Sequence, residues 1–182
     1  TINIINVDFN FTNIFDKISD KSNKYIEQCF QIADYLMKQK KAYGLINGPI
    51  SKKNFLKKRF LGITEYLAQM NNVKNFAMLI YNKNLSVSPI TTHVPVKKIS
   101  EQITEDKIKQ HISQIKNFYK LIFNKDVKIA ITGLNPHCES NFKDSEEKRI
   151  IIPTINKLKK KFSKINGPLP ADSLFMSENI KK

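Results

Sequence analysis

Short apolar runs that stop at loops marked by glycine or proline alternate with amphipathic helical segments along this chain of 182 residues. Residues 43–46, 76–81 and 127–132 are such runs, and their length is typical of buried strands. Residues 21–41 and 104–123 instead place apolar side chains at the spacing of an amphipathic helix. This alternation predicts an α/β fold with helices on both faces of a sheet, in three layers.

One pair of neighbouring runs predicts that the sheet is mixed. Residues 76–81 and 85–91 are separated only by the turn-forming residues 82–84, a spacing that favours an antiparallel hairpin. We therefore expect a three-layer α/β/α arrangement with a mixed sheet. We assign residues 1–182 to one α/β unit, because no repeat or low-complexity linker divides the chain.

Shorter segments complete the expected order of elements. Residues 51–56 and 64–69 have the pattern of short helices. Residues 145–162 form a longer helical pattern that contains Pro153, so the helix is expected to kink or restart there. Residues 165–170 are rich in glycine and proline and predict a loop.

The chain is strongly basic, with 31 lysine and arginine residues against 16 aspartate and glutamate residues and a net charge of +15. Such a charge is compatible with nucleic-acid binding. The basic residues are nevertheless spread along the chain in short runs, and no helical pattern interleaves arginines with aromatic side chains. We therefore favour a hydrated lysine surface over a nucleic-acid interface.

The apolar content and the cysteines indicate a cytoplasmic protein. No apolar stretch approaches the roughly 18 residues that a membrane-spanning helix needs, and no basic-then-apolar leader is present. The two cysteines, Cys29 and Cys138, are too few for a disulfide framework and are expected to be reduced thiols.

Two histidines share one kind of position, just past a strand-like run and beside a proline. They are His93 in Thr-Thr-His-Val-Pro and His137 in Leu-Asn-Pro-His. Strand ends are where α/β proteins present their chemistry. Neutral imidazole is a common ligand of divalent metals, but for either histidine taken alone a structural or incidental role is favoured over metal binding. The shared position nevertheless makes the pair the best guide to function.

Five phrases, in this order along the chain, carry a resemblance to a known family. They are G-L-I-N-G-P-I-S-K at 44–52, G-I-T-E-Y-L-A at 62–68, T-T-H-V-P-V at 91–96, G-L-N-P-H at 133–137 and N-G-P-L-P-A-D-S-L-F at 166–175. Together they resemble the PdxA family of 4-hydroxythreonine-4-phosphate dehydrogenases. The resemblance runs from about residue 40 to residue 175, and N-P-H and G-P-L-P-A-D are specific only in combination.

The resemblance implies an enzyme of vitamin B6 biosynthesis. It implies a homodimer with an isocitrate- or isopropylmalate-dehydrogenase-like fold. It also implies NAD- or NADP-dependent oxidation and decarboxylation of 4-hydroxythreonine 4-phosphate to 3-amino-2-oxopropyl phosphate. A divalent metal, zinc, magnesium or cobalt, would be held by three histidines drawn from both subunits.

The resemblance assigns roles to single residues of this chain. His93 and His137 match two of the metal ligands, and the third belongs to a Y-H-D-Q phrase that this sequence does not contain. Thr64 matches a residue that contacts substrate. Lys52 matches the lysine of the family's G-P-x-x-K turn, where it would either bind the substrate phosphate or be one more surface lysine. Asp172 matches the family's P-A-D phrase, where it would either orient a histidine or cap the following turn.

Two further positions lie beside the predicted ligands. Glu139 follows His137 closely and is assigned, like Asp172, to support the ligands without binding the metal. Ile63 stands where the family has a substrate-contacting histidine, and the run after His137 lacks a family glycine.

The resemblance covers only the central part of the family's sequence. The N-terminal G-E-P-A-G-I-G-P phrase and the C-terminal third do not occur here. Two alternatives to an active dehydrogenase therefore stay open. One is a catalytically degenerate relative that binds metal or phosphate as a dimer, and the other is a basic nucleic-acid-binding module.

Overall fold

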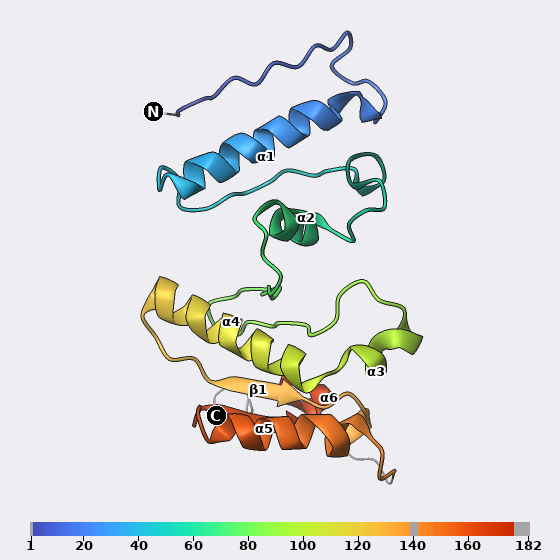
Figure 1. Ribbon diagram of the computed structural model, residues 1–182, viewed down its shortest axis with the longest axis vertical. Helices are drawn as coiled ribbons and strands as arrows, with labels where there is room; N and C mark the ends of the chain where they lie inside the picture. Colours follow the sequence, from blue (N-terminus) through green and yellow to red (C-terminus); the bar gives the residue numbers. More distant parts are fainter. Residues whose placement is uncertain (1, 139–141, 177–182) are drawn as a thin grey trace. The chain divides into compact units, whose positions relative to one another are not determined.

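The computed structural model describes residues 2–138 and 142–176, and Figure 1 shows their helices and strands. Contacts between Cα atoms divide the chain into two compact units, Thr1–Asn72 and Val73–Lys182. Each unit has a hydrophobic core of its own. The assignment of the whole chain to one α/β unit stays a prediction.

The first unit is built on one long helix and two short ones. Helix α1 spans Asn23–Lys38, and Ser22 precedes it without a side-chain hydrogen bond to the helix. A single π-helical turn, η2, spans Lys52–Leu56, and α2 spans Ile63–Met70. Both short helices confirm the predicted segments to within a residue or two.

Aromatic side chains hold these three helices together. Phe30 of α1 lies 6.0 Å from Phe55 and 5.3 Å from Tyr66, measured between ring centroids. Phe55 and Tyr66 lie 5.1 Å apart in an edge-to-face arrangement. Edge-to-face aromatic pairs add about 0.5–1.5 kcal/mol beyond the apolar area that they bury. Phe30, Phe55 and Leu56 thus form the buried centre of this unit.

The predicted strand at residues 43–46 is wrong for the structure described here. These residues have no strand conformation, and the side chains of Tyr43 and Ile46 are fully exposed. A short apolar run becomes a strand only where a neighbouring strand pairs with its backbone and a packed layer covers its side chains. Neither condition is met at this segment within the described part of the first unit.

The second unit contains a small parallel sheet. Strands β1 (Ile129–Thr132) and β2 (Ile165–Leu169) pair with Ile129 opposite Ile165. The π-helical turn η5 (Glu147–Ile151) and α5 (Ile152–Lys159) connect them. This strand–helix–strand order confirms the α/β class.

Strand β2 replaces the loop predicted for residues 165–170, so that prediction is wrong. Gly167 has φ of +131°, and a Cβ atom there would lie 2.4 Å from the backbone oxygen of Ile131 on β1. The register shifts between Ala130 and Thr132 at the same place. Glycine therefore allows an irregular strand to approach its neighbour closely, a role that composition does not distinguish from a turn.

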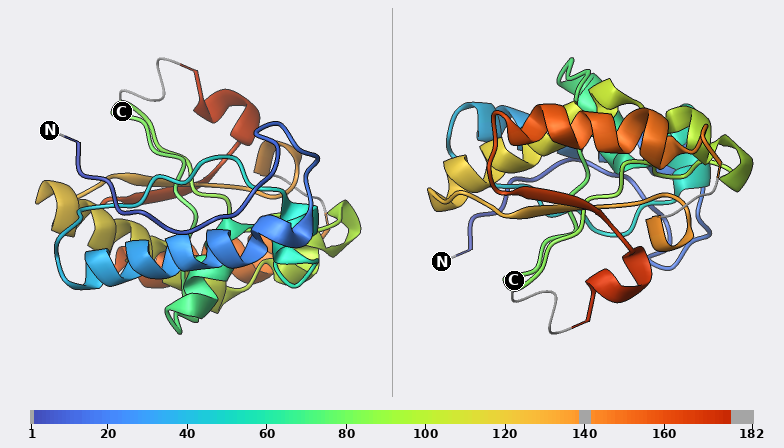
Figure 2. Two further views of the ribbon diagram at one scale, coloured as in Figure 1. Left: turned by 90° about the horizontal axis from the view of Figure 1, so that it is seen from above. Right: turned by 90° about the horizontal axis from the view of Figure 1, so that it is seen from below.

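Two helices cover one face of this sheet. Figure 2 shows α4 (Glu105–Phe123) and α5 on the same side of β1 and β2. Branched aliphatic side chains fill the space between helices and sheet: Ile103, Ile108, Ile112, Ile151, Ile155, Leu158 and Ile165. The core thus fixes the sheet against α4 and α5.

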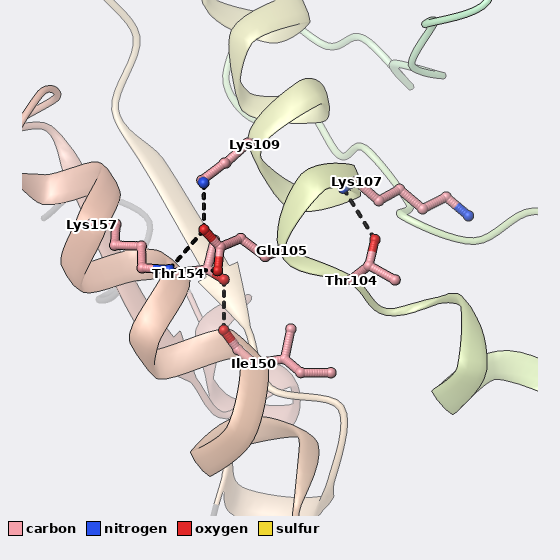
Figure 3. A network of polar contacts seen from close by, with 7 residues as sticks. All are labelled: Thr104, Glu105, Lys107, Lys109, Ile150, Thr154 and Lys157. Atoms are coloured by element: carbon pink, nitrogen blue, oxygen red, sulfur yellow. Dashed lines mark hydrogen bonds and ion pairs between the residues drawn. The ribbon is translucent and has the colours of Figure 1, made fainter.

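Helix α4 confirms the predicted helical segment almost residue for residue. Thr104 is its N-cap, and its Oγ1 accepts a hydrogen bond from the backbone N–H of Lys107 at 3.2 Å. Glu105 in the first turn forms ion pairs with Lys109 of the same helix and with Lys157 of α5, the latter at 2.7 Å (Figure 3). The ion pair with Lys157 therefore links α4 to α5 at their solvent-exposed side.

Pro153 lies at the start of α5, as the predicted restart requires. Proline lacks the N–H that a continuous helix would need at this point. The hydroxyl of Thr154 donates to the backbone oxygen of Ile150 at 2.6 Å, so that this carbonyl is satisfied despite the irregular turn (Figure 3).

The predicted hairpin is reduced to one antiparallel bridge. The backbone N–H and oxygen groups of Ile80 and Val87 pair with each other at 2.8 and 3.0 Å. The direction of the hairpin is confirmed, but residues 76–81 and 85–91 are not strands as predicted.

Among residues 2–138 and 142–176, no helix has both the length and the apolar character needed to cross a membrane.

Candidate metal and substrate site

The loop that follows β1 presents His137 to solvent. Pro136–Cys138 form a tight 3-10 turn, closed by a hydrogen bond from the Cys138 N–H to the Asn135 oxygen at 3.1 Å. His137 itself has the left-handed backbone conformation, with φ of 57° and ψ of 11°. Its side chain is 74% exposed, so the imidazole is accessible to a ligand.

Asp172 lies beside His137, at the end of the neighbouring strand. It belongs to the short helix α6 (Ala171–Leu174), which begins shortly after β2. Its Oδ2 is 3.3 Å from Nδ1 of His137, and its Oδ1 accepts the N–H of Ser173 at 2.8 Å. The sequence left two roles open for Asp172, and its carboxylate makes the contact that each requires. It lies next to the His137 ring, and it accepts a hydrogen bond in the turn that follows.

The pairing of His137 with Asp172 follows from sheet topology. Neighbouring parallel strands end at the same edge of a sheet, so the segments that follow β1 and β2 come together there. The N–H of Gly133 donates to the oxygen of Leu169 at 3.1 Å, which holds the two strand ends in register.

The donor chemistry of this pair fits a divalent metal. A carboxylate at Nδ1 of a histidine fixes the ring and its tautomer and leaves Nε2 free to coordinate. Among residues 2–138 and 142–176, however, no three histidine, cysteine, aspartate or glutamate side chains form a group that could hold a metal ion. The described residues therefore supply an accessible imidazole with a carboxylate beside it, and not a complete metal site.

His93 lies in a second exposed loop of the same unit. It has φ of 57° and is followed by the turn η3 (Val96–Lys98). His93 and His137 thus share both an exposed loop position and a left-handed backbone conformation. Their assignment as metal ligands stays a prediction.

The predicted substrate-binding residues belong to the first unit. Lys52 is the exposed first residue of η2, and Thr64 is the half-buried second residue of α2. Glu65, which follows Thr64, has a buried Oε2 atom without a hydrogen-bond partner among the described residues. The roles of Lys52 and Thr64 stay predictions, and Glu139 lies outside the described residues.

The structure shows one residue beside the site that sequence reasoning missed. Glu147 opens the helical segment between β1 and β2, and only 1% of it is exposed. Its Oε1 accepts the backbone N–H groups of Leu134 and Asn135 at 2.7 and 2.8 Å. Its Oε2 accepts the side-chain amide of Asn135 at 2.7 Å.

The hydrogen bonds of Glu147 keep its carboxylate charged. Burial raises the pKa of Glu147, but the hydrogen bonds from the backbone and side chain of Asn135 and from the backbone of Leu134 outweigh burial and lower the pKa overall. In the sequence, Glu146 and Glu147 look like ordinary acids in the first turn of a helix. The polar Leu-Asn-Pro-His loop was the available signal that a partner should exist.

The sequence of this chain is similar to the sequences of known proteins. A family model described as pyridoxal phosphate biosynthetic protein PdxA matches residues 1–182. The 4-hydroxythreonine-4-phosphate dehydrogenase of Sulfurihydrogenibium sp. is 36% identical over 178 residues, which cover 96% of this chain and 54% of that protein. The D-threonate 4-phosphate dehydrogenase of Pectobacterium atrosepticum is 27% identical over 82% of this chain and 47% of its own length.

A solved structure agrees with the sequence comparison. The crystal structure of 4-hydroxythreonine-4-phosphate dehydrogenase from Klebsiella pneumoniae matches with a TM-score of 0.79 and 25% identity. The match covers 90% of this chain and 51% of that one. The chain therefore spans about half the length of the relatives that it matches.

The class of this chain follows from its fold, from the loops at its strand ends and from its relatives. It comprises α/β proteins whose named members are dehydrogenases. Within that class, the chain belongs to the PdxA family of pyridoxal phosphate biosynthetic proteins. The resemblance inferred from the five sequence phrases is thereby confirmed.

Proposed function

We propose that the protein containing this chain oxidises 4-hydroxythreonine 4-phosphate with NAD or NADP in pyridoxal phosphate biosynthesis. Hydride transfer from the hydroxyl-bearing carbon to the nicotinamide, with loss of the hydroxyl proton, gives a β-keto acid. Loss of CO2 then gives 3-amino-2-oxopropyl phosphate. The observation that carries the proposal is the His137–Asp172 pair, which joins the N-P-H and P-A-D phrases in a family of dehydrogenases.

The proposed cofactors include a divalent metal, zinc, magnesium or cobalt. A bound metal supplies Lewis-acid chemistry, which acidifies a hydroxyl group and stabilises negative charge on oxygen. His93 and His137 are the proposed ligands in this chain, and a third histidine would come from elsewhere in the assembled protein. Asp172 supports this role because its carboxylate lies at Nδ1 of His137, which leaves Nε2 free to coordinate.

The remaining predicted site residues bind substrate in this proposal. Lys52 is exposed at the start of η2, where its ammonium group can reach a phosphate. Thr64 at the start of α2 offers a hydroxyl for a hydrogen bond to substrate. Glu139 is proposed to support the loop of His137 as Asp172 does.

The whole protein is proposed to be a homodimer in the cytoplasm, with each site shared between two subunits. A three-layer α/β/α architecture with a mixed sheet, like that of isocitrate dehydrogenase, is proposed for the complete fold. The antiparallel bridge between Ile80 and Val87 and the parallel pairing of β1 with β2 support a sheet with both strand directions.

An assay of the natural-length protein tests the function directly. The protein is mixed with NAD or NADP, zinc, and 4-hydroxythreonine 4-phosphate, and reduced nicotinamide is followed by absorbance. D-threonate 4-phosphate serves as the competing substrate, because one relative carries that name. Preferential turnover of 4-hydroxythreonine 4-phosphate supports the proposal, and turnover of neither substrate would overturn it.

One observation favours a second candidate, a catalytically degenerate relative that binds metal or phosphate. Ile63, at the family's histidine position, packs against the core formed by Phe30, Phe55 and Leu56. An isoleucine can neither donate a hydrogen bond nor bind phosphate. Zinc uptake by the protein without any nicotinamide reduction would favour this candidate over the dehydrogenase.

A further inference from the structure

The buried carboxylate of Glu147 is not one of the expected metal ligands, yet it is among the most completely enclosed side chains described. A charged group is buried at this depth only where hydrogen bonds compensate for lost hydration. Here three donors from the loop that leads to His137, as described above, approach the two carboxylate oxygens. The carboxylate thus binds the backbone and a side chain of this loop.

We propose that Glu147 is a positioning residue, which fixes the loop of residues 133–138 and so determines where the imidazole of His137 lies. This inference rests on the proposed function, because it assigns Glu147 a role at the same site.

The packing of the loop against Glu147 supports this assignment. A Cβ atom at Gly133 would lie 3.1 Å from Oε1 of Glu147 and 2.6 Å from Sγ of Cys138. The loop therefore closes so tightly on itself and on the carboxylate that Gly133 has no space for a side chain. A rigid support of this kind is what a ligand-bearing loop needs, since small displacements weaken metal binding.

A second carboxylate, that of Glu146, also binds Asn135 of the same loop. Glu146 accepts the side-chain amide of Asn135 at 2.9 Å and is itself held by the hydroxyl of Ser100. The Asn135 amide group thus lies between two carboxylates. Asp172 contacts His137 on the other strand end, so the loop is held from the helix side and from the β2 side.

The first test asks whether Glu147 fixes the loop, without any metal. Amide hydrogen exchange is measured in the purified natural-length protein and in its Glu147→Gln variant, which keeps the shape of the side chain. The N–H groups of Leu134 and Asn135 are expected to be protected in the natural protein and to exchange at least tenfold faster in the variant. Unprotected amides in the natural protein would overturn the proposal.

The second test asks whether the fixed loop matters for His137. Zinc affinity is measured by titration against a competing chelator, and the visible spectrum of the cobalt-loaded protein reports ligand geometry. Glu147→Gln is expected to weaken zinc binding by about 10–100-fold, the usual effect of removing support from a metal ligand, and to alter the cobalt spectrum.

Two control variants separate positioning from general stability and charge. Leu158→Ala removes a core side chain from α5 and lowers stability without touching the loop. Glu101→Gln makes the same charge change at an exposed position of the second unit. Both should leave zinc affinity within about twofold of the natural protein at a temperature where all variants are folded.

The outcomes separate this inference from the proposed function. Equal zinc affinity of Glu147→Gln and the natural protein would overturn the positioning role while leaving the metal site intact. A protected loop in a protein that takes up no zinc would support the loop contact and overturn the metal assignment instead. Equal losses in Leu158→Ala and Glu147→Gln would also overturn the positioning role.

Discussion

Asp172 and His137 face each other across the ends of two parallel strands, with 3.3 Å between Oδ2 and Nδ1. Their side chains are 61% and 74% exposed. Solvent screens the attraction between exposed charges, so a pair of this kind contributes at most about 1 kcal/mol to stability. The pair therefore serves mainly to orient the imidazole ring of His137.

Replacing Asp172 should therefore affect metal binding more than folding. Asp172→Asn is expected to weaken zinc binding by about tenfold, because the ring loses its charged support. The free energy of unfolding should change by less than about 0.5 kcal/mol. Chelator competition and urea unfolding measure the two effects, with the exposed Asp126→Asn as the matched control. A large loss of stability without loss of zinc would contradict this role.

Removing either proposed ligand should abolish stoichiometric zinc binding. His93→Ala and His137→Ala each delete one nitrogen donor, and the remaining ligands hold zinc only weakly. His111→Gln removes a histidine elsewhere in the second unit and should keep the metal. The zinc content of dialysed protein is the measurement, and unchanged content in either alanine variant would refute the ligand assignment.

Gly133 and Gly44 offer a matched test of backbone crowding. A Cβ atom at Gly133 would overlap Cys138 Sγ at 2.6 Å, whereas nothing lies within 4 Å of the same atom at Gly44. Gly133→Ala is expected to cost about 1–3 kcal/mol of unfolding free energy, and Gly44→Ala close to none. Urea unfolding decides between them, and equal effects would show that the loop can rearrange.

His111 should make stability depend on pH. It is buried in α4, with Nδ1 3.5 Å from the hydroxyl oxygen of Ser88, and burial, followed by the nearby charge of Lys107, lowers its pKa below the ordinary 6.5. The unfolded chain then binds a proton that the folded chain does not, so acid favours unfolding. His111's contribution is complete above pH 6.5 and is lost as the pH falls through the lowered pKa.

The pH dependence of thermal unfolding measures this effect. The unfolding midpoint of the natural protein should fall between pH 7 and the lowered pKa, and His111→Gln should remove part of that slope because glutamine does not titrate. An identical slope in both proteins would show that other groups govern the acid sensitivity.

The helices of the fold could be predicted because their signals are local. The apolar spacing and the cap residue Thr104 define α4 within a few turns of chain, and Pro153 marks the restart of α5 by its missing N–H. Such patterns do not depend on which other segment packs nearby.

The strands and part of the site depend on distant partners and were less predictable. Residues 43–46 have the composition of a strand, but no neighbouring strand pairs with them in the described part of the chain. Gly167 lies in a segment with the composition of a turn, yet that segment forms β2. In the sequence, Glu147 resembles an ordinary acid at the start of a helix. Only the folded structure shows that it accepts hydrogen bonds from Asn135 in a distant loop. His137 and Asp172 could be assigned only through a family resemblance, because nothing local indicates that they meet.

The parallel pairing of β1 with β2 also determines where this protein can tolerate change. The meeting of His137 with Asp172 is set by strand register and not by the length of chain between them. Residues added between α5 and β2 would leave that meeting undisturbed, since a surface connection can lengthen at small cost. One residue added between Leu169 and Asp172 would turn the carboxylate away from the ring, so a single inserted codon there could separate folding from metal binding.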